Sequence, residues 1–159
     1  MNFNFLEIEN SLIGNKIKIE KFIKNISSEK SDAWLLEGPK GVGKATLSKI
    51  ITSKILGLAY NLIDKSDKKF YHPDLLLLEK DKDKQDIPVE EIRKLKRIFF
   101  KTSFSGIARI GIIDSINDIN KYGHNAILKI IEEPPNNSII FIINHLTSMI
   151  PATIRSRCK

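Results

Sequence analysis

Residues 38–44 (GPKGVGK) have the composition and spacing of a phosphate-binding loop, in which two glycines enclose four residues and a lysine follows. Glycines allow successive backbone N–H groups to turn toward one phosphate, and the lysine supplies a mobile positive charge. The apolar run 33–36 predicts a strand before this loop, and helical spacing over 47–58 predicts a helix after it. We therefore expect a nucleotide-phosphate site, with a glycine-rich turn that binds nothing as the alternative.

The position after the loop lysine argues against a complete magnesium site. Loops of this kind that hydrolyse ATP place Ser or Thr there, because its hydroxyl binds Mg²⁺ beside the phosphates. This chain has Ala45 at that position, and Thr46 follows one residue later. One residue along a helix turns the side chain by about 100°, so we expect Thr46 to point away from the same ion.

The residues at the end of the apolar run 109–113 also lack a group that hydrolysis needs. The apolar run 109–113 ends at Asp114, which fits the residue that holds Mg²⁺ indirectly in phosphate-loop proteins. In motor-type members a Glu follows and orients the attacking water, but here Ser115 follows, and a hydroxyl cannot act as a general base near neutral pH. Asp118 as a substitute base is the less favoured alternative. The sequence predicts a site that binds ATP and hydrolyses it very weakly or not at all.

Apolar runs and helical spacing alternate along the chain. Strands are expected at residues 33–36, 74–79, 109–114 and 138–144, and helices at 19–26, 47–58, 88–99, 120–131 and within 151–159. Continuous apolar runs are typical of strands buried on both faces of a parallel sheet. This alternation predicts an α/β fold, a mostly parallel sheet with helices on both faces and ligands at the carboxyl ends of its strands.

The composition describes one globular domain with an excess of positive charge. The chain has 159 residues, 42% of them hydrophobic, and 26 basic against 19 acidic residues give a net charge of +7. This charge favours a polyanionic neighbour such as nucleic acid, although a composition rich in Lys and Ile also produces it without one. The single Cys158 excludes an internal disulfide framework. Apolar runs are shorter than a membrane span, and a secretory signal is not evident, so we expect a cytoplasmic protein without membrane contact.

Four motifs in order resemble the first domain of bacterial DNA polymerase III clamp-loader subunits, which are members of the AAA+ superfamily. They are residues 38–44, 112–114 (IID), 125–135 (NAILKIIEEPP) and 153–158 (TIRSRC). The two later motifs are more specific than the phosphate loop. The resemblance implies an AAA+ nucleotide-binding domain over residues 1–159. It also implies that the family's fifth strand, helical lid and collar domain, which follow the Ser-Arg-Cys motif, are absent from this sequence.

Departures from the motor subunits resemble the non-motor, delta-prime branch of the family. Motor subunits (gamma and tau) keep the Ser or Thr after the loop lysine, an Asp-Glu pair and a four-cysteine zinc module. This chain has Ala45, Ser115 and a cysteine-free stretch at 57–73. The resemblance therefore implies a stator subunit with no zinc, which binds ATP without hydrolysis and Mg²⁺ only together with nucleotide.

The resemblance also implies roles for individual residues. The residues facing the phosphates would be Gly38, Gly41, Gly43, Lys44 and Thr46, with Asp114 facing any Mg²⁺ and Asn144 sensing the γ-phosphate. Arg157 would be an arginine finger, supplied in trans to the ATP site of a neighbouring subunit. Its implied partners are the gamma/tau and delta subunits, and the sliding clamp and primer-template DNA through the assembled complex. Alternatively, Arg155 and Arg157 merely cap the tail or pair with Glu132 and Glu133.

Two other functions compete with the stator hypothesis. The first is an active, gamma/tau-like AAA+ ATPase that uses Thr46 and Asp118 as substitutes. The second is a stand-alone phosphate-loop kinase, which is less favoured because a lid and an acceptor-binding carboxylate are not evident. Beside Arg157, Cys158 could have a lowered pKa, but a packing role is favoured. Four basic residues of the expected helix 88–99 form a solvated face or, less favoured, a contact with DNA phosphates: Arg93, Lys94, Lys96 and Arg97.

Overall fold

The computed structural model describes residues 22, 24–26, 32–58, 72–145 and 149–159. The described strands are β1 (Asp32–Glu37), β2 (Leu75–Leu78), β3 (Arg109–Ile113) and β4 (Ser138–Asn144). The described helices are α3 (Lys44–Leu56), α5 (Val89–Phe99), the 3-10 turn η1 (Ile116–Asp118), α6 (Lys121–Ile131) and α7 (Ala152–Arg155). The expected helix at 19–26 lies largely outside the described residues. Within the described residues, every helix is too short or too polar to cross a membrane.

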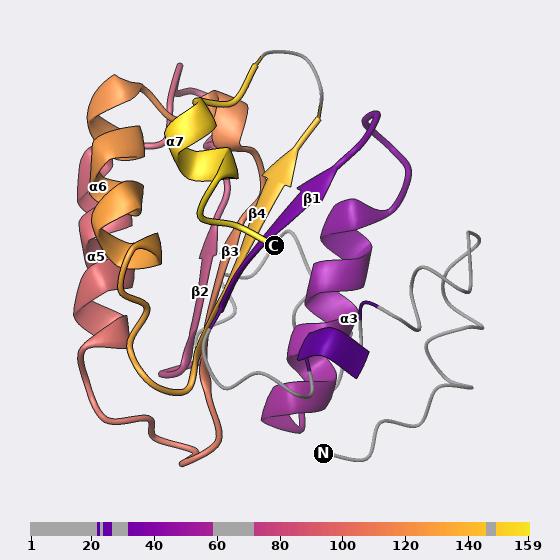
Figure 1. Cartoon of the computed structure of the whole chain (residues 1–159), viewed down its shortest axis with the longest axis vertical. Coiled ribbons are helices and arrows are strands. Elements are labelled where there is room, and N and C mark those ends of the chain that lie inside the picture. The colour runs from indigo at the N-terminus through magenta and orange to yellow at the C-terminus, as the bar shows by residue number, and fades with distance from the viewer. Residues whose placement is uncertain (1–21, 23, 27–31, 59–71, 146–148) are drawn as a thin grey trace.

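The described strands form one sheet in the order β1-β4-β3-β2, and every pair is parallel. Helix α3 covers one face of the sheet, and α5, α6 and α7 lie on the opposite face (Figure 1). The predicted parallel α/β fold with helices on both faces is therefore confirmed. Its carboxyl strand ends meet at one edge, where β1 continues into the glycine-rich loop and β3 into Asp114.

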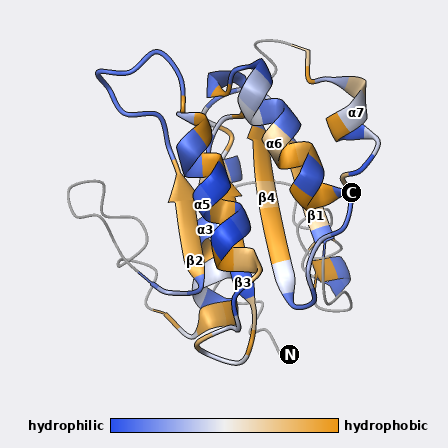
Figure 2. Ribbon diagram, turned by 90° about the vertical axis from the view of Figure 1, so that its left-hand side faces the viewer, coloured by the Kyte–Doolittle hydropathy of each residue, from blue (hydrophilic) through white to orange (hydrophobic). Residues whose placement is uncertain are grey.

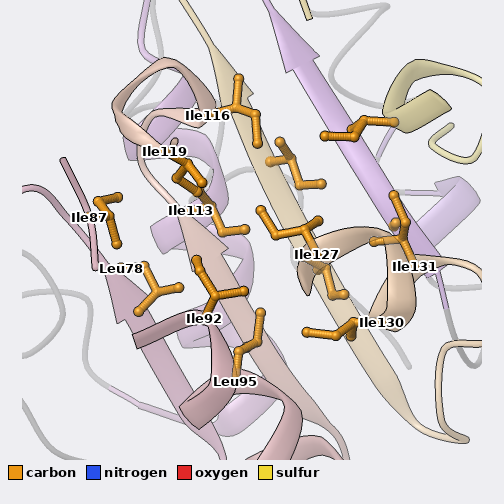
Figure 3. Packing of buried hydrophobic residues seen from close by; sticks show 14 of the residues in the cluster. Leu78, Ile87, Ile92, Leu95, Ile113, Ile116, Ile119, Ile127, Ile130 and Ile131 are labelled. Carbon is orange, nitrogen blue, oxygen red and sulfur yellow. The ribbon is translucent and has the colours of Figure 1, made fainter. Parts of the chain in front are cut away.

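Successive side chains of β4 point to opposite faces of the sheet and so contribute to two hydrophobic cores, one on each face. Ile139, Phe141 and Ile143 belong to the core beneath α3, whereas Ile140 and Ile142 belong to the core beneath α5 and α6. Figure 3 shows the second core, in which isoleucines and leucines of the sheet face those of the two helices. Figure 2 shows that the outward face of α5 is polar, as expected for a helix that buries one side only.

Local signals set the helix ends. Pro88 precedes the first residue of α5, and the side chain of Asn120 accepts hydrogen bonds from two amides in the first turn of α6. Gly57, with φ 66°, ends α3 in the left-handed conformation that glycine favours. Helix α3 begins at Lys44, three residues earlier than the apolar spacing indicated, because the lysine of the loop already forms its first turn.

Gly111 allows α5 to lie close to the middle of the sheet. A Cβ atom at this position of β3 would lie 2.5 Å from Leu95 Cδ1 and 3.2 Å from Phe99 Cζ. Leu95 and Phe99 are both fully buried, so neither side chain can move aside into solvent.

The C-terminal residue lies against the outer edge of β1. The backbone N–H of Lys159 donates to Ala33 O, and its carbonyl accepts from the Leu35 amide, both at 2.9 Å. The Lys159 ammonium is 2.7 Å from Asp32 Oδ2. The described sheet has four strands, and Lys159 lies beside β1 where a further strand would pair. The expectations about the fifth strand, the lid and the collar domain stay predictions.

Candidate nucleotide-binding site

The loop between β1 and α3 has the backbone conformation that phosphate binding requires. Gly38, Gly41 and Gly43 have φ angles of 155°, 89° and 88°, values that a residue with a Cβ rarely adopts. The loop runs directly into α3, a helix of 13 residues. Within the described residues, side chains do not cap the first amides of this helix, so these donors and the positive end of the helix dipole face the loop.

Lys44 lies folded against its own loop. Its ammonium donates to the carbonyls of Gly38 and Pro39, both at 2.7 Å, and the residue is only 8% exposed. Burial lowers the pKa of Lys44, and the nearby Asp114 partly opposes this effect. The third ammonium proton of Lys44 and the amides of the glycine-rich loop are donors of the kind that a phosphate needs, so the residues present fit a nucleoside triphosphate.

The magnesium side of the site is incomplete. The side chain of Ala45 packs against the hydrophobic core beneath α3, so this position offers an ion only a methyl group. Thr46 follows in the first turn of α3 and is partly buried. Asp114 follows the end of β3, and burial, with the neighbouring Glu79, raises its pKa, while Lys49 acts in the opposite direction. Asp114 thus lies near a second acid, Glu79, and a lysine, but the hydroxyl that usually binds the ion beside the phosphates is replaced by the Ala45 methyl group.

A general base is also not assembled from the neighbouring residues. Ser115 occupies the position after Asp114 and is 7% exposed. Asp118 Oδ1 lies 3.2 Å from the Lys80 ammonium, and the backbone carbonyl of Asp118 accepts from Ile87 N–H. The carboxylate of Asp118 therefore lies in a partly exposed ion pair, and its use as a substitute base stays the less favoured prediction.

Asn144 ends β4 at the same edge of the sheet and is 1% exposed. Its backbone carbonyl accepts from Gly38 N–H at 3.2 Å, and its side-chain oxygen accepts from Asn117 Nδ2, also at 3.2 Å. Its amide nitrogen donates to Glu37 Oε1 at 2.9 Å, and Arg155 Nη2 lies 2.8 Å from that same oxygen. The sequence analysis identified Asn144 and Arg155 but missed Glu37 and Asn117, whose partners lie far away in the sequence.

Arg157 lies at the surface just after α7. Its side chain is 37% exposed, Nη1 donates to Thr153 O at 2.9 Å, and Nη2 lies 3.0 Å from Glu132 Oε1. Arg155 pairs with Glu37 rather than with Glu133. The alternative that these arginines pair with the acids at the end of α6 therefore holds for Arg157 and is wrong for Arg155.

Cys158 packs against the core beneath α5 and α6. Burial raises the pKa of its thiol to about 11, so the suggestion that Arg157 lowers this pKa is wrong. The favoured packing role agrees with this environment. The expectation of no zinc module stays a prediction, since residues 59–71 lie outside the described part of the chain.

The chain matches a sequence profile for the family described as "DNA polymerase III, delta subunit" over residues 14–159. The chain belongs to this clamp-loader family. DNA polymerase III subunit delta' of Pseudomonas aeruginosa is 27% identical to it over 143 residues, 82% of this chain and 42% of the relative. DNA polymerase III subunit gamma of Buchnera aphidicola subsp. Schizaphis graminum is 28% identical over 156 residues, 92% of this chain and 42% of the relative.

A solved structure supports the fold of the clamp-loader domain. The DNA polymerase III gamma subunit-related protein of Thermotoga maritima superimposes with a TM-score of 0.69 at 20% sequence identity, over 89% of this chain and 44% of that protein. The chain thus spans less than half the length of these relatives. Its α/β fold is that of an N-terminal AAA+ domain of a clamp-loader subunit, and the relatives include both delta' and gamma subunits.

Proposed function

We propose that this chain belongs to a non-motor, stator subunit of the DNA polymerase III clamp loader. In this role it binds ATP without hydrolysing it and supplies Arg157 to the ATPase site of a neighbouring subunit. One observation carries the proposal: the loop has the geometry of a phosphate site, whereas Ala45 and Ser115 stand where the hydroxyl and the base would be. A site with this composition retains binding and lacks the groups for hydrolysis.

The loop and its surroundings would bind the phosphates by charge and hydrogen bonding. The amides of the loop and the first turn of α3 donate to phosphate oxygens, and Lys44 turns its ammonium from Gly38 and Pro39 toward them. Asn144 lies at the adjacent strand end, where its amide is already oriented by Glu37 and Asn117. When bound, Mg²⁺ would neutralise phosphate charge and would be held mainly by the nucleotide, with Asp114 as the acid that faces it.

The guanidinium of Arg157 would act on a neighbour's nucleotide. During hydrolysis, negative charge on the transferred phosphoryl group is spread over its outer oxygens, and a planar guanidinium stabilises that charge with two directed N–H donors. Arg157 must first exchange Glu132 for the phosphate. Because both side chains of this ion pair are partly exposed, the pair is weak and the exchange is accessible.

The partners follow from this assignment. Gamma/tau and delta subunits would surround this chain, and the assembled loader would place the sliding clamp on primer-template DNA in the cytoplasm. Identity alone does not separate the stator from a gamma-like ATPase, because the values are 27% and 28% for the two relatives. Ala45 and Ser115 favour the stator, since a gamma-like role would require a hydroxyl and a carboxylate at these two positions.

The Arg157→Ala variant of the full-length protein tests the proposal in a reconstituted loader. We expect hydrolysis to fall by about 10³ at the one site that receives Arg157, and total ATP turnover to fall by the share of that site. Lys84→Ala is the matched control, because Lys84 also forms a partly exposed ion pair, with Asp81 at 2.9 Å, in the loop before α5. Turnover that is equal in both variants and wild type would exclude the finger role.

A further inference from the structure

One carboxylate oxygen connects the phosphate loop with the short helix α7. Glu37 Oε1 lies 2.9 Å from Asn144 Nδ2 and 2.8 Å from Arg155 Nη2. Glu37 and Asn144 are register partners in β1 and β4, and both lie directly beside Gly38, the first residue of the loop. Arg155 is the last residue of α7, two positions before Arg157. The Glu37 carboxylate therefore links the residues beside the phosphate loop to α7, the helix that precedes Arg157.

Several contacts hold α7 and the residues after it, and one of them reaches the phosphate loop. The helix has four residues, and Ile154 is its fully buried member, packed in the core beneath α5 and α6. After the helix, Arg157 pairs with Glu132, Cys158 packs in the same core, and the backbone of Lys159 pairs with β1. The ion pair of Arg155 with Glu37 is the contact on the side of the phosphate loop.

Glu37 also places a negative charge beside a site built for anions. Its side chain is 26% exposed, and that of Arg155 is 55% exposed. Within about a Debye length of the loop, an unpaired carboxylate would oppose a triphosphate, and the guanidinium of Arg155 offsets this charge. An anion at the loop and the pairing of Arg155 with Glu37 should therefore favour each other, and by linkage the effect is reciprocal.

We propose that Glu37 is a positioning residue that couples the phosphate loop to α7, so that ATP at the loop stabilises the orientation of the helix that carries Arg157. The inference rests on the proposed function, because it treats Arg157 as the group delivered to a neighbour. It adds that the stator's own nucleotide regulates that delivery, although this nucleotide is not hydrolysed.

ATP affinity of the full-length protein gives the first test, with predictions of opposite sign. Arg155→Gln should weaken ATP binding about three-fold, since Glu37 is then uncompensated, and Glu37→Gln should tighten it about three-fold. The double variant should bind as Glu37→Gln does, because Arg155 acts only through Glu37. Arg155→Lys keeps the positive charge and can still donate to Glu37, so this variant should bind ATP like wild type.

A merely structural role predicts a different pattern, in which both substitutions weaken binding and the unfolding midpoint falls in parallel. That pattern would overturn the proposal. The proposal would also be overturned if Arg155→Gln changed ATP affinity equally in the wild-type and the Glu37→Gln backgrounds. Failure of the wild-type protein to bind ATP would overturn it as well.

Partner turnover gives the second test and separates this inference from the proposed function. In the reconstituted loader, Glu37→Gln and Arg155→Gln should each lower kcat about three-fold at the one site that receives Arg157, with KM unchanged, and Arg155→Lys should retain the wild-type value. Lys84→Gln serves as the control for loss of one paired cation. If Arg157→Ala lowers turnover but the Glu37 and Arg155 variants match the control, only the coupling fails. If Arg157→Ala has no effect, both the finger role and the coupling fail.

Discussion

Replacing Glu132 by Gln should make this chain a better activator of a partner's ATPase. Arg157 Nη2 lies 3.0 Å from Glu132 Oε1, and the two side chains are 37% and 46% exposed. A pair this exposed contributes about 1 kcal/mol or less, because water screens the charges and two long side chains must be ordered. Arg157 has to leave this pair to reach a phosphate. Glutamine keeps the shape of Glu132 without its charge. The concentration of this chain that gives half-maximal activation of the partner should therefore fall by up to about five-fold.

Titration of the full-length variant into the motor subunits measures this effect as the concentration for half-maximal ATP turnover. The advantage over wild type should shrink as salt is raised, since salt screens the pair that the substitution removes. Glu90→Gln is a suitable control, because Glu90 forms an exposed pair with Arg93 at 3.4 Å on α5. Weaker activation by Glu132→Gln than by wild type would show instead that Glu132 orients Arg157 toward the partner's site.

Two further predictions concern buried ionisable groups. Burial raises the pKa of Asp114 above its ordinary 3.8, so its ionised form destabilises the fold as pH rises through the native pKa. Asp114→Asn should therefore increase the free energy of unfolding by urea near pH 8 and lose this advantage at about pH 3.8; an unchanged or lower value near pH 8 would contradict this. Because the Cys158 pKa is about 11, its alkylation near pH 8 should be about 100-fold slower in folded than in unfolded protein. Equal rates would show an accessible thiolate.

Much of the fold could be predicted because its signals are local. Apolar runs such as 138–144 could be read as buried strands, and Pro88 and Asn120 lie at the predicted helix starts. The phosphate loop was likewise recognisable, because its chemistry requires glycines and a lysine at fixed spacing within a few residues.

The polar contacts around the site could not be predicted in the same way. Glu37 meets Asn144 and Arg155 across 107 and 118 residues of sequence, and neither spacing follows a local period. The proximity of Arg157 to Cys158 in sequence suggested a lowered thiol pKa, but burial in the core has the larger effect and raises it. Burial of this kind depends on tertiary packing, which a neighbouring residue type does not reveal.

In the proposed function, this subunit binds a triphosphate and leaves hydrolysis to a neighbour. ATP binding and ATP turnover by the full-length protein alone, measured for wild type and Lys44→Ala, test this division of roles. We predict that wild type binds ATP, that Lys44→Ala abolishes binding, and that neither protein releases phosphate above background. Steady phosphate release by wild type that Lys44→Ala abolishes would show that the subunit hydrolyses ATP itself.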